Sequence, residues 1–136
     1  MHRAAVERPG AFTPIPHKLY LAAKRRRCQI PGCHAVYGTL KQYDGSAKDL
    51  ILVKQQIHHL LGRRFLNHNG IFEHSLANLL SVCNFCHGRA KVAEDRLAVA
   101  DLAGFMEEMR RINFPLRKIA GFACSVGLTE FQRWLI

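Results

Sequence analysis

The stretch "SVCNFCHGRAK", residues 81–91, contains two cysteines separated by two residues and followed at once by a histidine. A C-x2-C spacing is typical of a zinc-binding turn, because two thiolates at this spacing can occupy one edge of a tetrahedral site. The apolar run "LANLLSVC" predicts a strand over 76–83, and the residues from 84 onward predict the start of a helix. The stretch therefore predicts a strand, a metal-binding turn and a helix in direct succession.

A second cysteine pair, Cys28 and Cys33, lies about fifty residues earlier in "RCQIPGC". The Pro-Gly pair between these cysteines predicts a tight turn. With Cys83 and Cys86 they supply four sulfur ligands, the set typical of a structural Zn²⁺ site. Two alternatives stay open at this point: four unrelated buried cysteines, or His34 as a ligand in place of one thiolate.

Composition favours a nucleic-acid partner. The chain of 136 residues is 49% hydrophobic, which predicts one globular domain with extensions. Lys and Arg total 20 against 10 acidic residues, giving a net charge of +10. This excess favours a polyanion over a generically basic surface, since the basic runs at 24–28, 62–64 and 88–91 lie near the Cys and His clusters.

The sequence has no long apolar segment. A membrane span needs about 18–20 apolar residues, and no run of that length occurs. The N-terminal stretch also lacks the apolar region of a signal peptide. We therefore expect no membrane association and a reducing, cytoplasmic location, where paired cysteines are more often metal ligands than disulfides.

The remaining pattern predicts an α+β chain in three parts: an arm over 1–15, a zinc-containing module over 16–97 and a helical extension over 98–136. Within these parts the expected elements are a helix over 16–27, a loop over 44–49, a strand over 50–60, a loop over 62–70, a helix over 92–112, a helix after Pro115, and a last helix over 129–136 with Thr129 as its N-cap.

Three motifs, "RCQIPGC", "IHHLLG" and "ANLLSVCNFCH", place a His, an Asn and a His in order within the four-cysteine frame. Taken together they resemble the HNH nuclease family, over roughly residues 27–91. The resemblance implies a small ββα-metal module with a four-cysteine zinc site, flanked here by an N-terminal helix and C-terminal helices. It also implies a metal-dependent endonuclease that hydrolyses phosphodiester bonds in DNA to leave a 3′-hydroxyl and a 5′-phosphate.

The same resemblance implies roles for four residues. His59 would be the general base, His87 a ligand of a catalytic divalent metal, and Asn78 the side chain that holds the loop carrying His59. His58 stands where many members have an Asp ligand. Because imidazole is softer than carboxylate, Ni²⁺, Co²⁺ or Zn²⁺ would serve as well as Mg²⁺ or Mn²⁺. A neutral imidazole can accept a proton from water or bind a metal ion near pH 7.

Basic residues around this motif predict contacts with DNA phosphates: Arg63 and Arg64 in the loop, and Arg89 and Lys91 on the helix after His87. A module this small is expected to have weak sequence specificity or to take it from a protein partner. Small nucleases of this kind are frequent in phage and mobile-element genomes, so a bacterial or phage-infected cell is the expected setting.

Two rival functions remain open. One is a non-catalytic zinc module that binds nucleic acid, and the other is a nuclease that acts on RNA. Other polar residues are interpreted conservatively: His68 and His74 as exposed loop histidines, and Glu73 as a solvated carboxylate rather than a metal ligand. Cys124 is expected in the core. The last helices weakly resemble a helix-turn-helix, but packing over the core is favoured.

Overall fold

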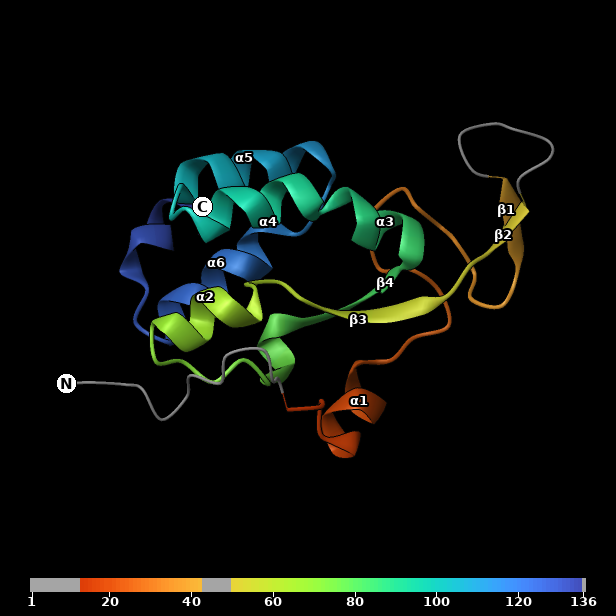
Figure 1. Cartoon of the computed structure of the whole chain (residues 1–136), viewed down its shortest axis with the longest axis horizontal. Helices are drawn as coiled ribbons and strands as arrows, with labels where there is room; N and C mark the ends of the chain where they lie inside the picture. Colours follow the sequence, from red (N-terminus) through yellow and green to blue (C-terminus); the bar gives the residue numbers. More distant parts are fainter. Residues whose placement is uncertain (1–12, 43–49, 136) are drawn as a thin grey trace.

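The computed structural model describes residues 13–42 and 50–135, so the predicted loop over 44–49 and most of the predicted arm over 1–15 lie outside it. The described chain is a mixture of helices and two small antiparallel sheets, as the sequence predicts for an α+β protein (Figure 1). Its elements are α1 (His17–Ala23), β1 (Leu40–Gln42), β2 (Leu50–Leu52), β3 (Gln55–His59), α2 (Arg63–His68), 3-10 helix η2 (Leu76–Asn78), β4 (Leu79–Cys83), α3 (Asn84–Arg89), α4 (Lys91–Ala98), α5 (Leu102–Arg111), α6 (Leu116–Ser125) and 3-10 helix η3 (Thr129–Trp134).

Strands β3 and β4 form the central hairpin-like pair. They are antiparallel, with His59 opposite Leu79 and Gln55 opposite Cys83. Every residue of β4 is buried, and the chain passes from Cys83 directly into α3. Figure 1 shows this pair across the middle of the molecule, with α4, α5 and α6 grouped at one end and the β1–β2 hairpin at the other. The register of β3 and β4 places the start of β3 beside the start of α3.

The predicted strand over 50–60 is two strands in two different sheets. Residues 50–52 pair with β1, whereas 55–59 pair with β4. The break occurs at Val53 and Lys54. The side chain of Val53 is buried in the core, and its backbone N–H donates to the carbonyl of Thr39. The backbone N–H of Lys54 donates instead to Asn84 Oδ1 at 2.9 Å. The apolar run thus continues across a bend that its composition does not reveal.

The predicted loop over 62–70 is wrong in its first half, because residues 63–68 form α2. Gly62 precedes the helix in an extended conformation, and the Arg-Arg-Phe-Leu run that follows has good helix propensity. Leu66 of this helix is fully buried. The predicted turn residues at the end of this stretch terminate the helix: Asn69 is its C-cap, and Gly70 has a φ of 75°.

The predicted helix over 92–112 is also wrong as a single element. It divides into α4 and α5 at 99–101, where Ala100 has a φ of 59°. Asp101 begins α5 as an N-cap, with its Oδ1 accepting a hydrogen bond of 3.0 Å from the backbone N–H of Gly104. Asp101 lies among regularly spaced apolar residues that predict one helix, but its side chain caps a new helix instead of continuing the first.

Two terminal helices are shorter than expected. Helix α1 ends at Ala23, so the basic run at 24–27 follows the helix rather than forming its last turn. The last segment is a 3-10 helix whose N-cap is Leu128, so the prediction of Thr129 as N-cap is wrong. The helix after Pro115, in contrast, forms as predicted as α6.

One contiguous apolar core joins the cysteine turns to the C-terminal helices. It includes Cys28, Val82, Phe105, Ile119 and Phe131, all buried. Helices α5 and α6 therefore pack over the core, the arrangement that the sequence favours over a helix-turn-helix for the C-terminal region. The half-buried Cys124 also packs against this core. Within the described residues, no helix combines the length and apolar character needed to cross a membrane.

Candidate functional site

The four paired cysteines form one cluster. The sulfur atoms of Cys28, Cys33, Cys83 and Cys86 all lie within 4.8 Å of one another, and the sulfurs of Cys33 and Cys83 are 3.7 Å apart. Three of the four residues are buried. The prediction that two turns about fifty residues apart come together is thus confirmed, and this cluster can hold a metal ion such as zinc.

Local backbone geometry builds each half of the cluster. In the first turn the N–H of Cys33 donates to the carbonyl of Ile30 at 3.0 Å, and His34 follows in a left-handed conformation with a φ of 58°. In the second, Cys83 is the N-cap of α3, and its sulfur accepts a hydrogen bond from the N–H of Cys86. His34 is exposed and is not a member of the cluster.

The electrostatics of the cluster favour a bound cation. The pKa of Cys28 is lowered to about 5, chiefly because the side chain of Cys86 hydrogen-bonds to its sulfur. The pKa of Cys86 is raised, first by that same hydrogen bond and then by burial, and burial raises the pKa of Cys83. Four thiols at this distance cannot all ionise unless a positive charge lies among them. A divalent ion with thiolate ligands meets that requirement.

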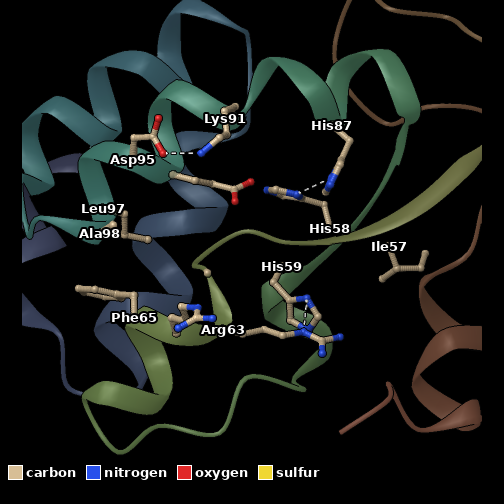
Figure 2. A pocket seen from close by; sticks show the side chains of 13 residues that line it. Ile57, His58, His59, Arg63, Phe65, His87, Lys91, Asp95, Leu97 and Ala98 are labelled. Carbon is tan, nitrogen blue, oxygen red and sulfur yellow. Dashed lines mark hydrogen bonds and ion pairs between the residues drawn. The ribbon is translucent and has the colours of Figure 1, made fainter. Parts of the chain in front are cut away.

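A histidine pair lies next to the cluster. Strand β3 directs His58 toward α3, where its Nδ1 lies 3.1 Å from Nδ1 of His87 (Figure 2). His58 is 3% exposed, and its Nε2 has no hydrogen-bond partner among the described residues. Burial, followed by the charges of His87 and His59, lowers the pKa of His58 to about 3. The ring is therefore neutral at pH 7 and has one unprotonated nitrogen, whose lone pair could bind a metal ion.

The two histidines of β3 and His87 line one cavity of about 540 Å³. Arg63 and Arg64 of α2 line the same cavity, as the predicted phosphate contacts require. Strand alternation points consecutive side chains to opposite faces, yet the cavity reaches both faces because the strand ends at His59. Imidazoles and guanidinium groups thus meet at one concave surface.

Helix α4 contributes both signs of charge to this cavity. Lys91 forms an ion pair of 2.7 Å with Asp95, which raises the pKa of the lysine. Glu94 also lines the cavity, and sequence reasoning did not single it out. Burial raises the pKa of Glu94, while the charge of His87 lowers it. Its separation of seven residues from His87, about two helical turns, is the signal that would have placed both on one face.

His59 points away from the first histidine pair. Its Nε2 lies 3.1 Å from Nδ1 of His74, and its Nδ1 is 3.5 Å from Nε of Arg63. Burial, followed by the charges of Arg63 and His74, lowers the pKa of His59 to about 3. His59 is therefore neutral at pH 7, with both ring nitrogens facing polar groups.

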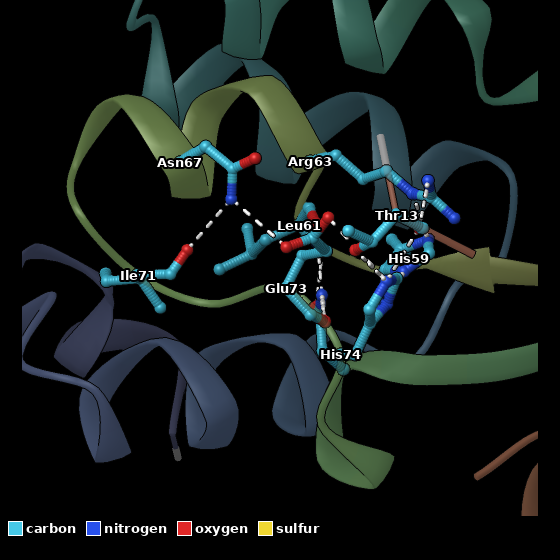
Figure 3. A network of polar contacts seen from close by, with 9 residues as sticks. Thr13, His59, Leu61, Arg63, Asn67, Ile71, Glu73 and His74 are labelled. Carbon is cyan, nitrogen blue, oxygen red and sulfur yellow. Dashed lines mark hydrogen bonds and ion pairs between the residues drawn. The ribbon is translucent and has the colours of Figure 1, made fainter. Parts of the chain in front are cut away.

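The expectation that His74 and Glu73 are solvated is wrong. His74 is 6% exposed, and its Nε2 lies 3.0 Å from the carbonyl oxygen of Thr13 (Figure 3). Glu73 is 3% exposed; its carboxylate accepts a hydrogen bond of 3.2 Å from Asn67 and lies 3.8 Å from His74. The apolar residues Phe72 and Leu76 lie close to them in sequence, but Phe72 and Leu76 are themselves exposed, so the local pattern does not predict this burial. His68 is exposed as expected.

Asn78 lies behind the histidines at the start of β4, with no exposed surface. Its Oδ1 accepts a hydrogen bond of 2.8 Å from the N–H of Leu61, and its Nδ2 donates to the carbonyls of Leu61 and Glu73 at 3.2 Å and 3.1 Å. These bonds join the segment after His59 to the segment before His74. Asn78 thus fixes the backbone on both sides of that histidine contact.

Arg89 lies apart from the other predicted phosphate ligands. It lines a second cavity, next to Lys41 and Phe85, between α3 and the β1–β2 hairpin. The nitrogen of Lys41 lies 5.1 Å from the centre of the Phe85 ring. The structure therefore divides the four predicted DNA-contacting residues between two surfaces.

Comparisons of the chain with known protein families, with curated proteins and with solved structures found no match.

Proposed function

We propose that this chain is a metal-dependent endonuclease of the HNH type that hydrolyses phosphodiester bonds in DNA. The observation that carries the proposal is the presence of two separate sets of metal donors around one short helix. A buried sulfur cluster holds the start of α3, and the contact between His58 and His87 lies at the wall of an arginine-lined cavity. The first set suits an architectural ion, and the second is accessible to a substrate.

The sulfur set fits Zn²⁺ in a structural role. All four donors come from the protein and three are buried, so the site has no open position for a substrate. Cys83 and Cys86 both belong to the first turn of α3, and Cys86 is one position before His87. An ion there would fix the orientation of the helix that presents this histidine.

The histidine set fits a divalent cation. The Nδ1 atoms of His58 and His87 are 3.1 Å apart, close enough for one ion to contact both at the usual metal–nitrogen length of about 2.0–2.1 Å. Mg²⁺, Mn²⁺, Ni²⁺, Co²⁺ and Zn²⁺ are the candidates, with imidazole favouring the later ones. When bound, such an ion would supply a positive charge for the scissile phosphate and the leaving oxygen.

His59 is the proposed general base. In the hydrolysis a water oxygen forms a bond to phosphorus, its proton passes to the imidazole of His59, and the bond to the 3′-oxygen breaks. Burial and the charge of Arg63 keep the pKa of His59 at about 3 in the free protein. A phosphate placed beside Arg63 offsets that charge, which raises the pKa of the imidazole toward the range useful at pH 7.

Arg63, Arg64 and Lys91 surround the cavity and are the proposed contacts to the DNA backbone. Arg89, on the second surface, would contact phosphates farther along the strand. The net charge of +10 supports a polyanionic substrate, and contacts of this type carry little sequence information. Specificity would then come from a protein partner.

Cleavage of supercoiled plasmid tests the proposal. Wild type, His59→Ala and, as a matched control, a variant of the exposed His17 are each incubated with the plasmid in Mg²⁺, Mn²⁺, Ni²⁺, Co²⁺ or Zn²⁺. We expect wild type and His17→Ala to nick or linearise the plasmid in at least one ion. We expect His59→Ala to lose about 10²-fold or more in rate while it still binds DNA.

Two outcomes would replace the proposal. Equal and negligible cleavage by wild type and His59→Ala, with tight binding of DNA by both, would identify a nucleic-acid-binding module without catalysis. Cleavage of labelled structured RNA but not of plasmid would reassign the substrate to RNA.

A further inference from the structure

His59 belongs to a closed ring of four polar contacts (Figure 3). Arg63 Nε lies 3.5 Å from His59 Nδ1, and His59 Nε2 lies 3.1 Å from His74 Nδ1. His74 Nε2 lies 3.0 Å from the carbonyl oxygen of Thr13, which also accepts a hydrogen bond of 3.2 Å from Arg63 Nη1. The four residues come from the N-terminal segment, the end of β3, the start of α2 and the segment before η2.

Two groups in the ring have a single hydrogen-bonding role: the Thr13 carbonyl accepts and the Arg63 guanidinium donates. Together they indicate which nitrogen of each neutral histidine carries the proton. A carbonyl oxygen only accepts, so the proton of a neutral His74 must be on Nε2, which faces Thr13. Nδ1 of His74 is then bare and accepts, so His59 must carry its proton on Nε2. A guanidinium only donates, and it faces the remaining atom, His59 Nδ1. Both directions around the ring therefore leave the lone pair of His59 on Nδ1.

Two further contacts agree with this assignment. The hydroxyl of Thr13 lies 3.2 Å from His74 Nε2, and a carboxylate oxygen of Glu73, which only accepts, lies 3.8 Å from that nitrogen. The carboxylate favours the proton on Nε2, and the hydroxyl, which can donate or accept, is compatible with it. His74 is also held by burial, so its ring cannot turn out to solvent without opening the core beneath it.

We propose that His74 is a positioning residue: anchored to the Thr13 carbonyl, it holds His59 in the tautomer protonated at Nε2 and so selects Nδ1 as the atom that receives the proton from water. The importance of this role for cleavage rests on the proposed nuclease function. The tautomer itself does not, because the hydrogen-bond ring determines it whether or not the protein cuts DNA. Arg63 lines the cavity and faces Nδ1, which places the selected atom at the cavity wall.

Asparagine is the informative replacement for His74. Its amide oxygen is separated from Cβ by the same number of bonds as Nδ1 of histidine, so His74→Asn keeps an acceptor for His59 while removing the ring. His74→Leu fills similar space with no acceptor. Thr13→Ala removes the hydroxyl but keeps the carbonyl that anchors His74, and His68→Leu, at the exposed end of α2, is the control.

The test measures tautomer, stability and cleavage for each of these variants. Long-range proton–nitrogen NMR spectra of the 15N-labelled protein distinguish a protonated ring nitrogen from a bare one at His59, whose signals are assigned by their loss in His59→Ala. We expect protonation at Nε2 in wild type, His74→Asn, Thr13→Ala and His68→Leu, and a mixture of tautomers in His74→Leu. We expect kcat to fall about 10²-fold in His74→Leu, with KM little changed, and to recover largely in His74→Asn.

A single Nε2-protonated form of His59 in folded His74→Leu, or wild-type His59 protonated at Nδ1, would overturn the role of His74. Equal losses of kcat in the leucine and asparagine variants at matched unfolding temperatures would overturn it as well. Failure of wild type to cleave any substrate would instead reject the nuclease function, and the NMR spectra would still determine the tautomer.

Discussion

His58 and His59 are consecutive residues of β3, yet each ring contacts a different histidine at the same distance of 3.1 Å. His58 meets His87 of α3, and His59 meets His74 of the segment before η2. One strand thus separates the proposed metal-binding pair from the pair that holds the proposed general base. Changes on one side of the strand should therefore leave the other side intact.

Replacing His87 tests whether the two metal sites are independent. His87→Ala removes one of the two imidazoles proposed as metal ligands in the cavity and no donor from the sulfur cluster. We expect Mn²⁺ affinity to fall by at least about 10-fold, in line with the roughly 10–100-fold cost of losing even an outer-shell partner, and zinc content to stay at that of wild type. Calorimetric titration and elemental analysis measure the two quantities. Loss of zinc from this variant would contradict the separation of the sites.

Replacing Cys83, unlike replacing His87, should remove the zinc and unfold the protein. Cys83→Ser removes a sulfur ligand while leaving a side chain that can cap α3, so the loss of zinc content and folding should come from the lost ligand. The expected loss exceeds about 5 kcal/mol, because zinc binding contributes about 10–16 kcal/mol in zinc-finger peptides. Cys124→Ser, outside the cluster, is the control and should keep its zinc. Thermal unfolding with and without a chelator measures the difference.

Gly104 is required by the cap that starts α5. A Cβ at this position would collide with the carboxylate of Asp101, so Gly104→Ala should displace the cap. We expect a loss of about 1 kcal/mol or more, the usual value of an N-cap, although alanine favours helices. Gly121→Ala in α6 has no atom within 4 Å of the new methyl group and should stabilise by about 0.4–1 kcal/mol. Urea unfolding compares them; a stabilising Gly104→Ala would contradict the role of the cap.

Asn78 should contribute to both stability and activity. Asn78→Ala leaves the backbone N–H of Leu61 and the carbonyls of Leu61 and Glu73 without their buried partner. Each unsatisfied group costs about 1–3 kcal/mol, so we expect a loss of roughly 3 kcal/mol in the free energy of unfolding. Asn69→Ala, at an exposed helix end, should cost under about 1 kcal/mol. If both variants unfold at the same urea concentration, the bracing role of Asn78 is wrong.

The two basic surfaces predict different effects on DNA binding. Arg64→Ala changes the cavity beside the histidines, and Arg89→Ala changes the second cavity. We expect each to reduce the slope of log K against log salt by about one, equally for unrelated DNA sequences. Only Arg64→Ala should also slow cleavage at saturating DNA. Arg110→Ala, on the outer face of α5 in an ion pair with Glu107, is the control and should leave the slope unchanged.

The metal cluster could be predicted from sequence because cysteine spacing directly encodes turn geometry. Cys28 and Cys33 flank a Pro-Gly turn, and Cys83 and Cys86 span one helical turn, so each pair is recognisable without knowledge of the other. The position of His87 follows from the same turn. The strand predicted over 76–83 forms only from Leu79, because residues 76–78 are the 3-10 helix η2, and the predicted helix follows Cys83 directly.

Other features depend on contacts that spacing does not encode. The burial of His74 results from the Thr13 carbonyl, 61 positions away in sequence. The break between α4 and α5 depends on whether Asp101 caps a helix or lies within one, which its apolar neighbours do not reveal. The bend after β2 likewise follows from a bond between Lys54 and Asn84 on another element. The contacts of His74 and Lys54 are tertiary interactions, whereas the cap of Asp101 is a local contact that competes with the helical pattern around it.

The distance of 50 positions between Cys33 and Cys83 also has a consequence for biosynthesis. A ribosome must add the entire intervening segment before the second turn exists, so a growing polypeptide holds only half of these four sulfur donors while residues 34–82 are added. The helix that presents His87 is secured only after residue 86 has emerged and met the earlier turn. A truncated product that ends before residue 83 would lack both the second pair of sulfur donors and His87.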